Sequence, residues 1–297
     1  MINYNKKKLK ISKEEIAYLE TGNGNETIVL VHGNMSSSIH YAPIIEKLAS
    51  NYKIIAPDLR GFGDSSYNNR FDSLHELAND LIEFLDSLKV KNAYLVGWST
   101  GGGVIMVIAA KRPDLVKKMV LLESVSPKGY PIFKKDAKGQ PLLGQVYPTK
   151  AEMEKDPVQV APSQGIILNK DYNTMTYIWN AVIYTAGNKP EEADNKVYMS
   201  ELFKQRCLFD VDWSLAKFNI TDQAGLYGLG DGLIKKIKAP ALVIWGEKDI
   251  TVLKYMFDET IQALATLAKP IIYQNSAHSP LIDKPDQLIA DIKAFCK

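Results

Sequence analysis

The chain has 297 residues, of which 46% are hydrophobic and 24% are charged. These fractions are close to those of an average soluble globular protein, so a mostly disordered chain is excluded and a sizeable core is expected. Lys and Arg number 36 against 34 Asp and Glu, which gives a net charge of +2. Because nucleic acid binding needs a concentrated positive field, we expect no nucleic acid partner.

The cysteines and the apolar runs indicate the compartment. Cys207 and Cys296 are far apart in the chain, which fits neither a disulfide framework nor the spacing of metal ligands. Residues 1–10 are polar and basic with no apolar stretch after them, so no signal peptide is expected. The longest apolar-rich run, residues 101–110, is about half of what a membrane-spanning helix needs. We therefore predict a cytoplasmic protein without a membrane span.

The first half of the chain alternates between strands and helices. Residues 9–11 and 16–19 predict an N-terminal hairpin, and a turn follows at residues 21–25. The predicted strands are then 27–32, 52–57, 93–96 and 119–122, and the predicted helices are 38–50, 73–89 and 101–111. The helix over 73–89 begins with Ser73 and Glu76 at the spacing of a capping box. Because these strands are apolar without alternation, we predict an α/β fold with a mostly parallel sheet covered on both faces.

The regular pattern stops near Ser124 and resumes at residues 241–245. Between them, residues 126–235 are rich in prolines and aromatic side chains, with helices predicted at 172–184 and 192–206. A helix at 254–267, a strand at 270–274 and a helix at 285–295 complete the pattern. We predict one core domain formed by residues 1–125 and 236–297, with residues 126–235 inserted into it as a mainly helical cap.

The strongest motif is Gly97-Trp98-Ser99-Thr100-Gly101, which lies directly between a predicted strand and a predicted helix. A serine hydroxyl is a poor nucleophile unless it is held out toward a base, and a sharp strand-to-helix turn does this. Such a turn leaves no space for side chains two residues on either side, which explains both glycines. The alternative is a glycine-rich turn with an idle serine, but the strand–turn–helix position favours Ser99 as the nucleophile.

A general base for Ser99 is expected among four histidines. His278 is the only one downstream of Ser99 and follows the last predicted strand, so we assign it as the base. His40 and His75 are interpreted as ordinary surface or partly buried residues, and His32 as a structural hydrogen-bonding residue.

The base in turn needs a carboxylate that orients its ring. Asp249, just after the strand at residues 241–245, is our first choice. Glu247 in the same loop and Glu123 after the fourth central strand remain as competing candidates.

Two backbone amides are expected to bind the oxyanion of the tetrahedral intermediate. One is the N–H of Thr100, the residue after the nucleophile, and the other is the N–H of Asn34, in the loop after the first central strand. Trp98, Trp179 and Tyr184 are predicted to contribute to an apolar substrate pocket. Neither a metal site nor an organic cofactor is predicted.

Five segments together resemble the α/β-hydrolase superfamily over nearly the whole chain. They are residues 32–34 (HGN), residues 58–65 (DLRGFGDS), the turn around Ser99, residues 246–249 (GEKD) and residues 278–280 (HSP). The resemblance implies a structural role for residues 58–65. In finer detail, residues 97–103, 123–131, 178–185 and 218–220 are similar to bacillar intracellular short-chain polyhydroxyalkanoate depolymerases.

The resemblance and the motifs together predict a serine hydrolase that cleaves carboxylic esters through an acyl-enzyme. The expected substrate is an aliphatic ester or a short hydroxyalkanoate oligomer. A lactonase or a carbon–carbon bond hydrolase would use the same residues, and a non-catalytic ligand receptor is a further alternative. Ser99 argues against haloalkane dehalogenases and epoxide hydrolases, which need an aspartate there. The sequence does not predict the oligomeric state.

Overall fold

The computed structural model describes residues 5–297, and a mostly parallel eight-stranded sheet runs through its centre. Its order is β1-β2-β4-β3-β5-β6-β11-β12. The bounds are β1 (Lys7–Lys10), β2 (Glu15–Thr21), β3 (Thr27–Val31), β4 (Lys53–Pro57), β5 (Ala93–Trp98), β6 (Val116–Leu122), β11 (Ala241–Gly246) and β12 (Ala268–Tyr273). The β1–β2 and β2–β4 pairs are antiparallel, and all other neighbours are parallel. The predicted α/β fold and N-terminal hairpin are confirmed.

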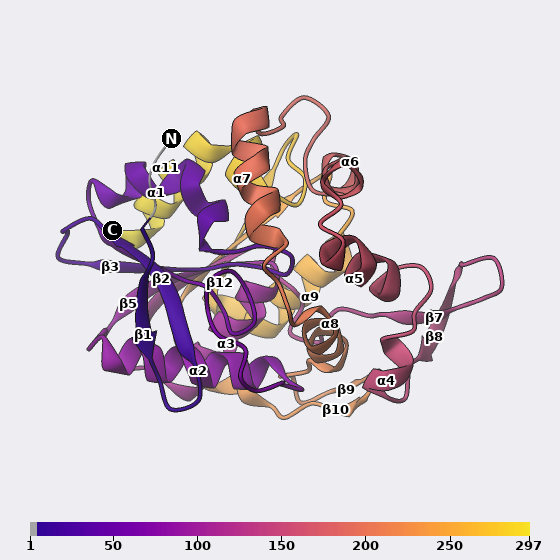
Figure 1. The fold of residues 1–297 in the computed structure, drawn as a ribbon. Coiled ribbons are helices and arrows are strands. Elements are labelled where there is room, and N and C mark those ends of the chain that lie inside the picture. Colours follow the sequence, from indigo (N-terminus) through magenta and orange to yellow (C-terminus); the bar gives the residue numbers. More distant parts are fainter. Residues whose placement is uncertain (1–4) are drawn as a thin grey trace.

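Helices cover both faces of this sheet, and the side chains of each strand alternate between them. In β3, Val29 and Val31 belong to one buried cluster and Ile28 and Leu30 to the other. The first cluster includes α2 (Leu74–Ser87), α3 (Thr100–Lys111) and α9 (Lys254–Leu264), and the second includes α1 (Ala42–Ala49) and α11 (Pro285–Cys296). In Figure 1, α1 and α11 lie above the sheet and α2 and α3 below it. Burial on both faces explains why the strands are continuously apolar.

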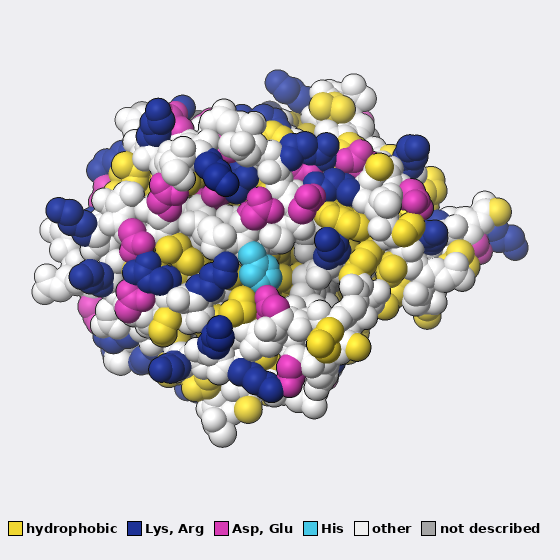
Figure 2. Space-filling view, turned by 90° about the horizontal axis from the view of Figure 1, so that it is seen from below, with side chains coloured by type: hydrophobic (Ala, Val, Ile, Leu, Met, Phe, Trp, Pro, Cys, Tyr) yellow, Lys and Arg dark blue, Asp and Glu magenta, His cyan; other side chains and the backbone are white. Residues whose placement is uncertain are grey.

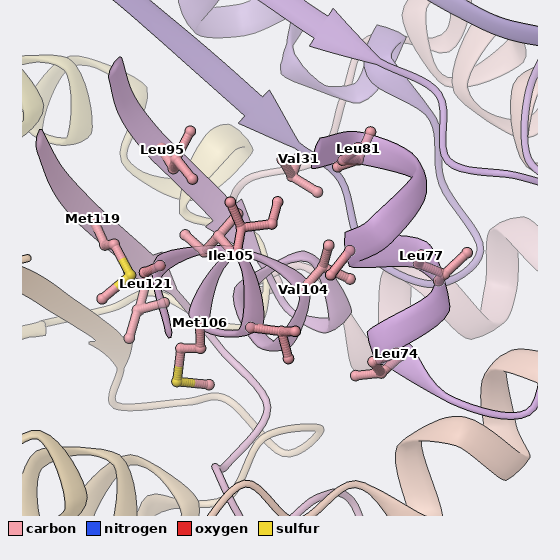
Figure 3. Packing of buried hydrophobic residues seen from close by; sticks show 14 of the residues in the cluster. Val31, Leu74, Leu77, Leu81, Leu95, Val104, Ile105, Met106, Met119 and Leu121 are labelled. Carbon is pink, nitrogen blue, oxygen red and sulfur yellow. The ribbon is translucent and has the colours of Figure 1, made fainter. Parts of the chain in front are cut away.

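Helix α3, which follows Ser99, is buried along almost its whole length. Figure 3 shows side chains of α3 between those of the sheet and the leucines of α2. The labelled side chains are Val31, Leu74, Leu77, Leu81, Leu95, Val104, Ile105, Met106, Met119 and Leu121. Gly103 allows close packing here, because a Cβ atom at this position would lie 2.9 Å from Leu74 Cδ1 and displace that side chain. Each large side chain that is fully buried contributes about 1.5–3 kcal/mol to stability, so the first turn of α3 is firmly held.

Residues 126–235, which we call the middle segment, leave the sheet after β6 and return before β11. The helices are α4 (Lys150–Met153), α5 (Val160–Leu168), α6 (Tyr172–Val182), α7 (Glu192–Leu202), α8 (Leu208–Lys217) and the 3-10 helix η2 (Leu233–Lys236). Two hairpins, β7 (Phe133–Lys135) with β8 (Pro141–Val146) and β9 (Ala224–Gly225) with β10 (Gly228–Leu229), were not predicted. The β7–β8 hairpin projects away from the sheet at the right of Figure 1. Exposed strands without an apolar face give little periodic signal, which explains why they were missed.

Several helix ends differ from the sequence predictions. Ser73 precedes α2, but its side chain makes no capping bond to the helix, so the predicted capping box is wrong. Instead, the Glu76 carboxylate accepts a hydrogen bond of 2.9 Å from the N–H of Asp72. The helix predicted at residues 38–50 begins as a 3-10 turn, η1 (Ser38–Tyr41), and the one at 254–267 ends as another, η3 (Ala265–Leu267).

The surface carries both signs of charge in similar amounts. Figure 2 shows basic and acidic side chains interspersed over one face, and hydrophobic side chains gathered toward its right-hand part. Within residues 5–297, no helix has the length and apolar character needed to cross a lipid bilayer.

Candidate active site

Ser99 lies in a strained turn between β5 and α3. Its backbone angles are φ 54° and ψ −118°, a conformation that non-glycine residues rarely adopt and that is characteristic of functional sites. The glycines beside it are sterically required. A Cβ atom on Gly97 would lie 2.5 Å from Gly101 O, and one on Gly101 would lie 2.1 Å from Val31 O. The turn that presents Ser99 therefore depends on glycine at positions 97 and 101.

The loop after β3 packs directly against this turn. A Cβ atom on Gly33 would lie only 2.9 Å from Ser99 Cβ, so the glycine allows the loop to approach. Asn34, which follows it, lines the same cavity as Ser99 and Thr100. Thr100 is the first residue of α3, and its N–H therefore has no acceptor within the helix. The positive end of the α3 dipole also favours negative charge here.

His278 and Asp249 form a buried pair at the carboxyl end of the sheet. The distance between His278 Nδ1 and Asp249 Oδ2 is 2.8 Å. The other carboxylate oxygen, Oδ1, accepts hydrogen bonds from the N–H groups of Thr251 and Val252. Burial alone would raise the pKa of Asp249, but His278 and these hydrogen bonds lower it below its usual value. Since Nδ1 is bound to Asp249, Nε2 is the ring nitrogen left for proton exchange.

The loop that carries His278 is tied to its neighbours on two sides. Trp98 Nε1, on the residue before Ser99, donates a hydrogen bond of 2.7 Å to the carbonyl oxygen of His278. Asp283 accepts hydrogen bonds from the N–H of Ala277 and from both the N–H and the hydroxyl of Thr185 in the middle segment. The sequence did not predict this role for Asp283, because its position before α11 looks like that of an ordinary helix-start acid.

The two competing acids have other partners. Glu247 is exposed and accepts a hydrogen bond from the N–H of Asn275. Glu123 is fully buried, and its Oε1 accepts a hydrogen bond of 2.7 Å from the N–H of Gly246. Burial, together with the nearby charge of Asp249, raises the pKa of Glu123 well above its usual value. These surroundings favour the protonated form of Glu123, and it is Asp249 that contacts the histidine.

The remaining histidines have structural surroundings. His32 Nε2 accepts a hydrogen bond from the N–H of Leu59, so Nδ1 donates to Gly33 O, and burial lowers its pKa to about 4. His40 is buried rather than at or near the surface, which corrects the interpretation from sequence. It stacks on Tyr198 with ring centroids 5.1 Å apart, and burial lowers its pKa to about 3. His75, on α2, lies 2.8 Å from Asp231 Oδ2.

Ser99, Asn34, Thr100 and His278 open into one cavity of about 280 Å³. Most of its wall is apolar, formed by residues that include Trp98, Val125, Ile178, Trp179, Val182, Ile183, Leu215, Ile250 and Val252. The Trp98 and Trp179 rings meet edge to face, with centroids 6.5 Å apart. Tyr184 packs against Trp179 at 5.8 Å and lies behind the cavity wall. The shape and lining suit an aliphatic group next to Ser99.

One polar side chain in this wall was not predicted. Asp212, from α8, is fully buried, and its Oδ1 accepts a hydrogen bond of 3.0 Å from Asn34 Nδ2. The side-chain oxygen of Asn34 in turn accepts a hydrogen bond of 2.8 Å from Gln205 Nε2. Burial raises the pKa of Asp212 to about 7. A signal existed in the sequence, because Asp212 interrupts the apolar face formed by Leu208, Val211 and Leu215.

Two groups of three potential metal ligands occur among residues 5–297. In the first, Glu123, Asp249 and His278 are already connected by the contacts described above. The second consists of Asp58, Asp64 and Glu201. There the Lys6 ammonium lies 2.7, 3.1 and 2.6 Å from the three carboxylates. It occupies the position between them that a metal ion would need. Asp58 also accepts hydrogen bonds from the N–H groups of Ser38 and Asp64, as the expected structural role of residues 58–65 requires.

Comparison with known proteins agrees with this architecture. Lipase 1 of Psychrobacter immobilis is 26% identical over 289 residues, covering 96% of this chain and 81% of the lipase. A putative lipase from Acinetobacter baumannii superposes with a TM-score of 0.75 at 21% identity, covering 99% of this chain and 91% of the other. An esterase from Thermogutta terrifontis superposes with a TM-score of 0.73 at 15% identity, and the match covers 98% of each chain. The profile of the family described as "alpha/beta hydrolase fold" matches residues 26–285. The chain belongs to this α/β-hydrolase family.

Proposed function

We propose that the protein is a serine hydrolase of carboxylic esters, with Ser99 as nucleophile, His278 as general base and Asp249 as its orienting acid. The observation that carries the proposal is the 2.8 Å contact between Asp249 and His278, on a loop bonded to Trp98 beside the strained Ser99. A named lipase among the relatives supports the reaction class. In this proposal the middle segment is a cap over the site.

The reaction would proceed in two halves. Ser99 Oγ attacks the ester carbonyl while His278 Nε2 takes the hydroxyl proton. The N–H groups of Asn34 and Thr100 hold the negative oxygen of the tetrahedral intermediate. His278 then gives the proton to the departing alcohol, and an acyl ester remains on Ser99. Water, deprotonated by His278, attacks this ester, and the carboxylic acid leaves as Ser99 regains its proton.

The cavity indicates the substrate class. A space of about 280 Å³ with an apolar wall suits a short aliphatic acyl group or a short hydroxyalkanoate oligomer. The similarity to polyhydroxyalkanoate depolymerases stays a prediction. The chemistry itself needs neither a metal nor an organic cofactor. Cys207 and Cys296 are both free thiols, as suits the proposed cytoplasmic location.

Hydrolysis of nitrophenyl esters with acyl chains of increasing length tests this proposal. We expect turnover to peak at short chains and to fall about 10⁴-fold or more in Ser99→Ala. Labelling by a fluorophosphonate should be stoichiometric in the wild type and absent in Ser99→Ala. Ser200→Ala, at an exposed serine of α7, is the matched control and should behave as wild type. Equal rates in the wild type and Ser99→Ala would refute the assignment.

A further inference from the structure

Asp212 is a buried acid in the wall of the catalytic cavity, and the proposed mechanism does not use it. It lies on α8 in the middle segment, opposite the loop that carries Asn34, and it lines the same cavity as Ser99 and His278. Its side chain reaches Asn34, whose backbone N–H is a proposed oxyanion donor. The Asp212 carboxyl therefore contacts the residue whose backbone N–H would bind the ester carbonyl oxygen.

The hydrogen bonding of this carboxyl is incomplete. Its one hydrogen bond within residues 5–297 is the one that Oδ1 accepts from Asn34 Nδ2. No Lys, Arg or His of the described chain forms an ion pair with it. By comparison, Asp210, two residues earlier, binds Arg70 and Lys150. A carboxyl that lines a cavity and has a single hydrogen bond keeps an oxygen that a bound molecule can contact.

We propose that Asp212 determines specificity by hydrogen-bonding a hydroxyl group carried by the ester substrate. The inference rests on the proposed esterase function and extends it to the substrate class. A neutral carboxyl donates a hydrogen bond and an ionised one accepts, and a hydroxyl can satisfy either form. A purely aliphatic ester would leave Asp212 without its second partner, and sites built for a hydroxyl discriminate strongly against analogues that lack it.

A purely structural role for Asp212 makes a different prediction. If the carboxyl only holds the Asn34 loop in place, its removal lowers the rate of every ester by the same factor. If it binds the substrate hydroxyl, its removal changes the ratio between hydroxylated and plain esters. Gln205→Leu separates the two roles, because Gln205 holds Asn34 from the other side and does not line the cavity.

The experiment compares kcat/KM for matched ester pairs in the wild type, Asp212→Leu and Gln205→Leu. The pairs are nitrophenyl butyrate with its 2-hydroxy and 3-hydroxy derivatives, and propyl butyrate with 2-hydroxyethyl butyrate. In at least one pair we expect the wild type to favour the hydroxylated ester tenfold or more. Asp212→Leu should bring this ratio close to one, and Gln205→Leu should keep the wild-type ratio while slowing all esters. A wild-type ratio near one in every pair, or an equal ratio in Asp212→Leu, overturns the proposal.

A binding measurement keeps this test independent of catalysis. Calorimetric titration of Ser99→Ala with methyl butyrate and with methyl 3-hydroxybutyrate needs no turnover. Tighter binding of the hydroxylated ester, lost in the Ser99→Ala/Asp212→Leu double variant, supports the role of Asp212 even if no ester is hydrolysed. Equal binding of both esters by Ser99→Ala overturns it. Failure of hydrolysis alone would refute only the proposed esterase function.

Discussion

Asp249 and Asp212 are the same chemical group, both buried beside the same cavity, yet their surroundings shift their pKa values in opposite directions. Asp249, at the end of the sheet, faces His278 and accepts two backbone N–H groups, which lower its pKa. Asp212, in the middle segment, has a single amide donor, and burial raises its pKa to about 7. Burial alone does not decide the charge of an acid; the number and charge of its partners do.

This difference separates two kinds of function. An acid that is charged and saturated with hydrogen bonds orients a histidine but has nothing left for a substrate. An acid with a single hydrogen bond still has a carboxyl oxygen that can bind a ligand. In the proposed mechanism, the carboxyl end of the sheet supplies the reaction chemistry and the middle segment supplies a group for recognition. The predictions that follow test this division.

Among the tests of this comparison, Asp249→Asn has the largest expected effect. The amide keeps the shape but stabilises the wrong tautomer of His278, so we expect kcat to fall about 10³–10⁴-fold. Steady-state rates on a nitrophenyl ester measure it, with Asp258→Asn on the exposed face of α9 as the matched control. Activity within tenfold of wild type would remove Asp249 from the mechanism and point to Glu123.

The pH dependence of stability should also separate the two acids. For Asp212 the folded pKa is raised, so the folded state holds its proton over a range where the unfolded chain has lost it. The stability contributed by this proton is present below about pH 4 and is lost as the pH rises toward 7. We expect the unfolding free energy of the wild type relative to Asp212→Asn to fall by up to about 3 kcal/mol between pH 4.5 and 8.5.

For Asp249 the folded pKa is lowered, so its contribution is complete above the unfolded value and is lost only at more acidic pH. The unfolding free energy of the wild type relative to Asp249→Asn should therefore stay flat over the same range. Urea denaturation of the three proteins at several pH values provides both curves. If the unfolding free energy of the wild type depended on pH in the same way relative to both variants, Asp212 and Asp249 would not have opposite pKa shifts.

Gln205→Leu tests the link between the middle segment and the Asn34 loop. Gln205 binds both the Asn34 side chain and the N–H of Met35, so its removal should loosen the proposed oxyanion donor. We expect kcat to fall about tenfold, less than the 10²–10³ typical of losing such a donor outright. An unchanged kcat would show that the loop holds its position without the middle segment.

The smallest effect is expected from Glu123→Gln. Because burial and the nearby charge of Asp249 favour the protonated form of Glu123, its amide replacement keeps the acceptor for Gly246 N–H and supplies an N–H donor in place of the acid proton. We expect kcat within about threefold of wild type. Glu123→Ala, which removes the donor and leaves a cavity, is the contrasting variant and should lose both activity and stability. A large loss in Glu123→Gln would mean that Glu123 carries charge.

The sheet and its helices could be predicted because their signals are local. Apolar runs marked β3 to β6 and β11, and the leucine stripe marked α2. Two predictions failed for different reasons. Ser73 leaves α2 uncapped because Glu76 binds the N–H of Asp72, a local contact, whereas His40 is buried against Tyr198, which is distant in sequence. The β7–β8 hairpin lacks an apolar face, so nothing in its composition separated it from a loop.

The sequence by itself determined the α/β fold, the family and the turn that presents Ser99, because glycine spacing and apolar periodicity act within a few residues. Only the tertiary structure decided which of three acids contacts His278, that burial raises the pKa of Glu123, and that Asp212 enters the cavity from the middle segment. These outcomes depend on how far water is excluded and on which side chains meet, from 29 residues apart for Asp249 and His278 to 178 apart for Asn34 and Asp212. The local sequence pattern predicts neither these contacts nor the exclusion of water, yet together they set the charge of each acid.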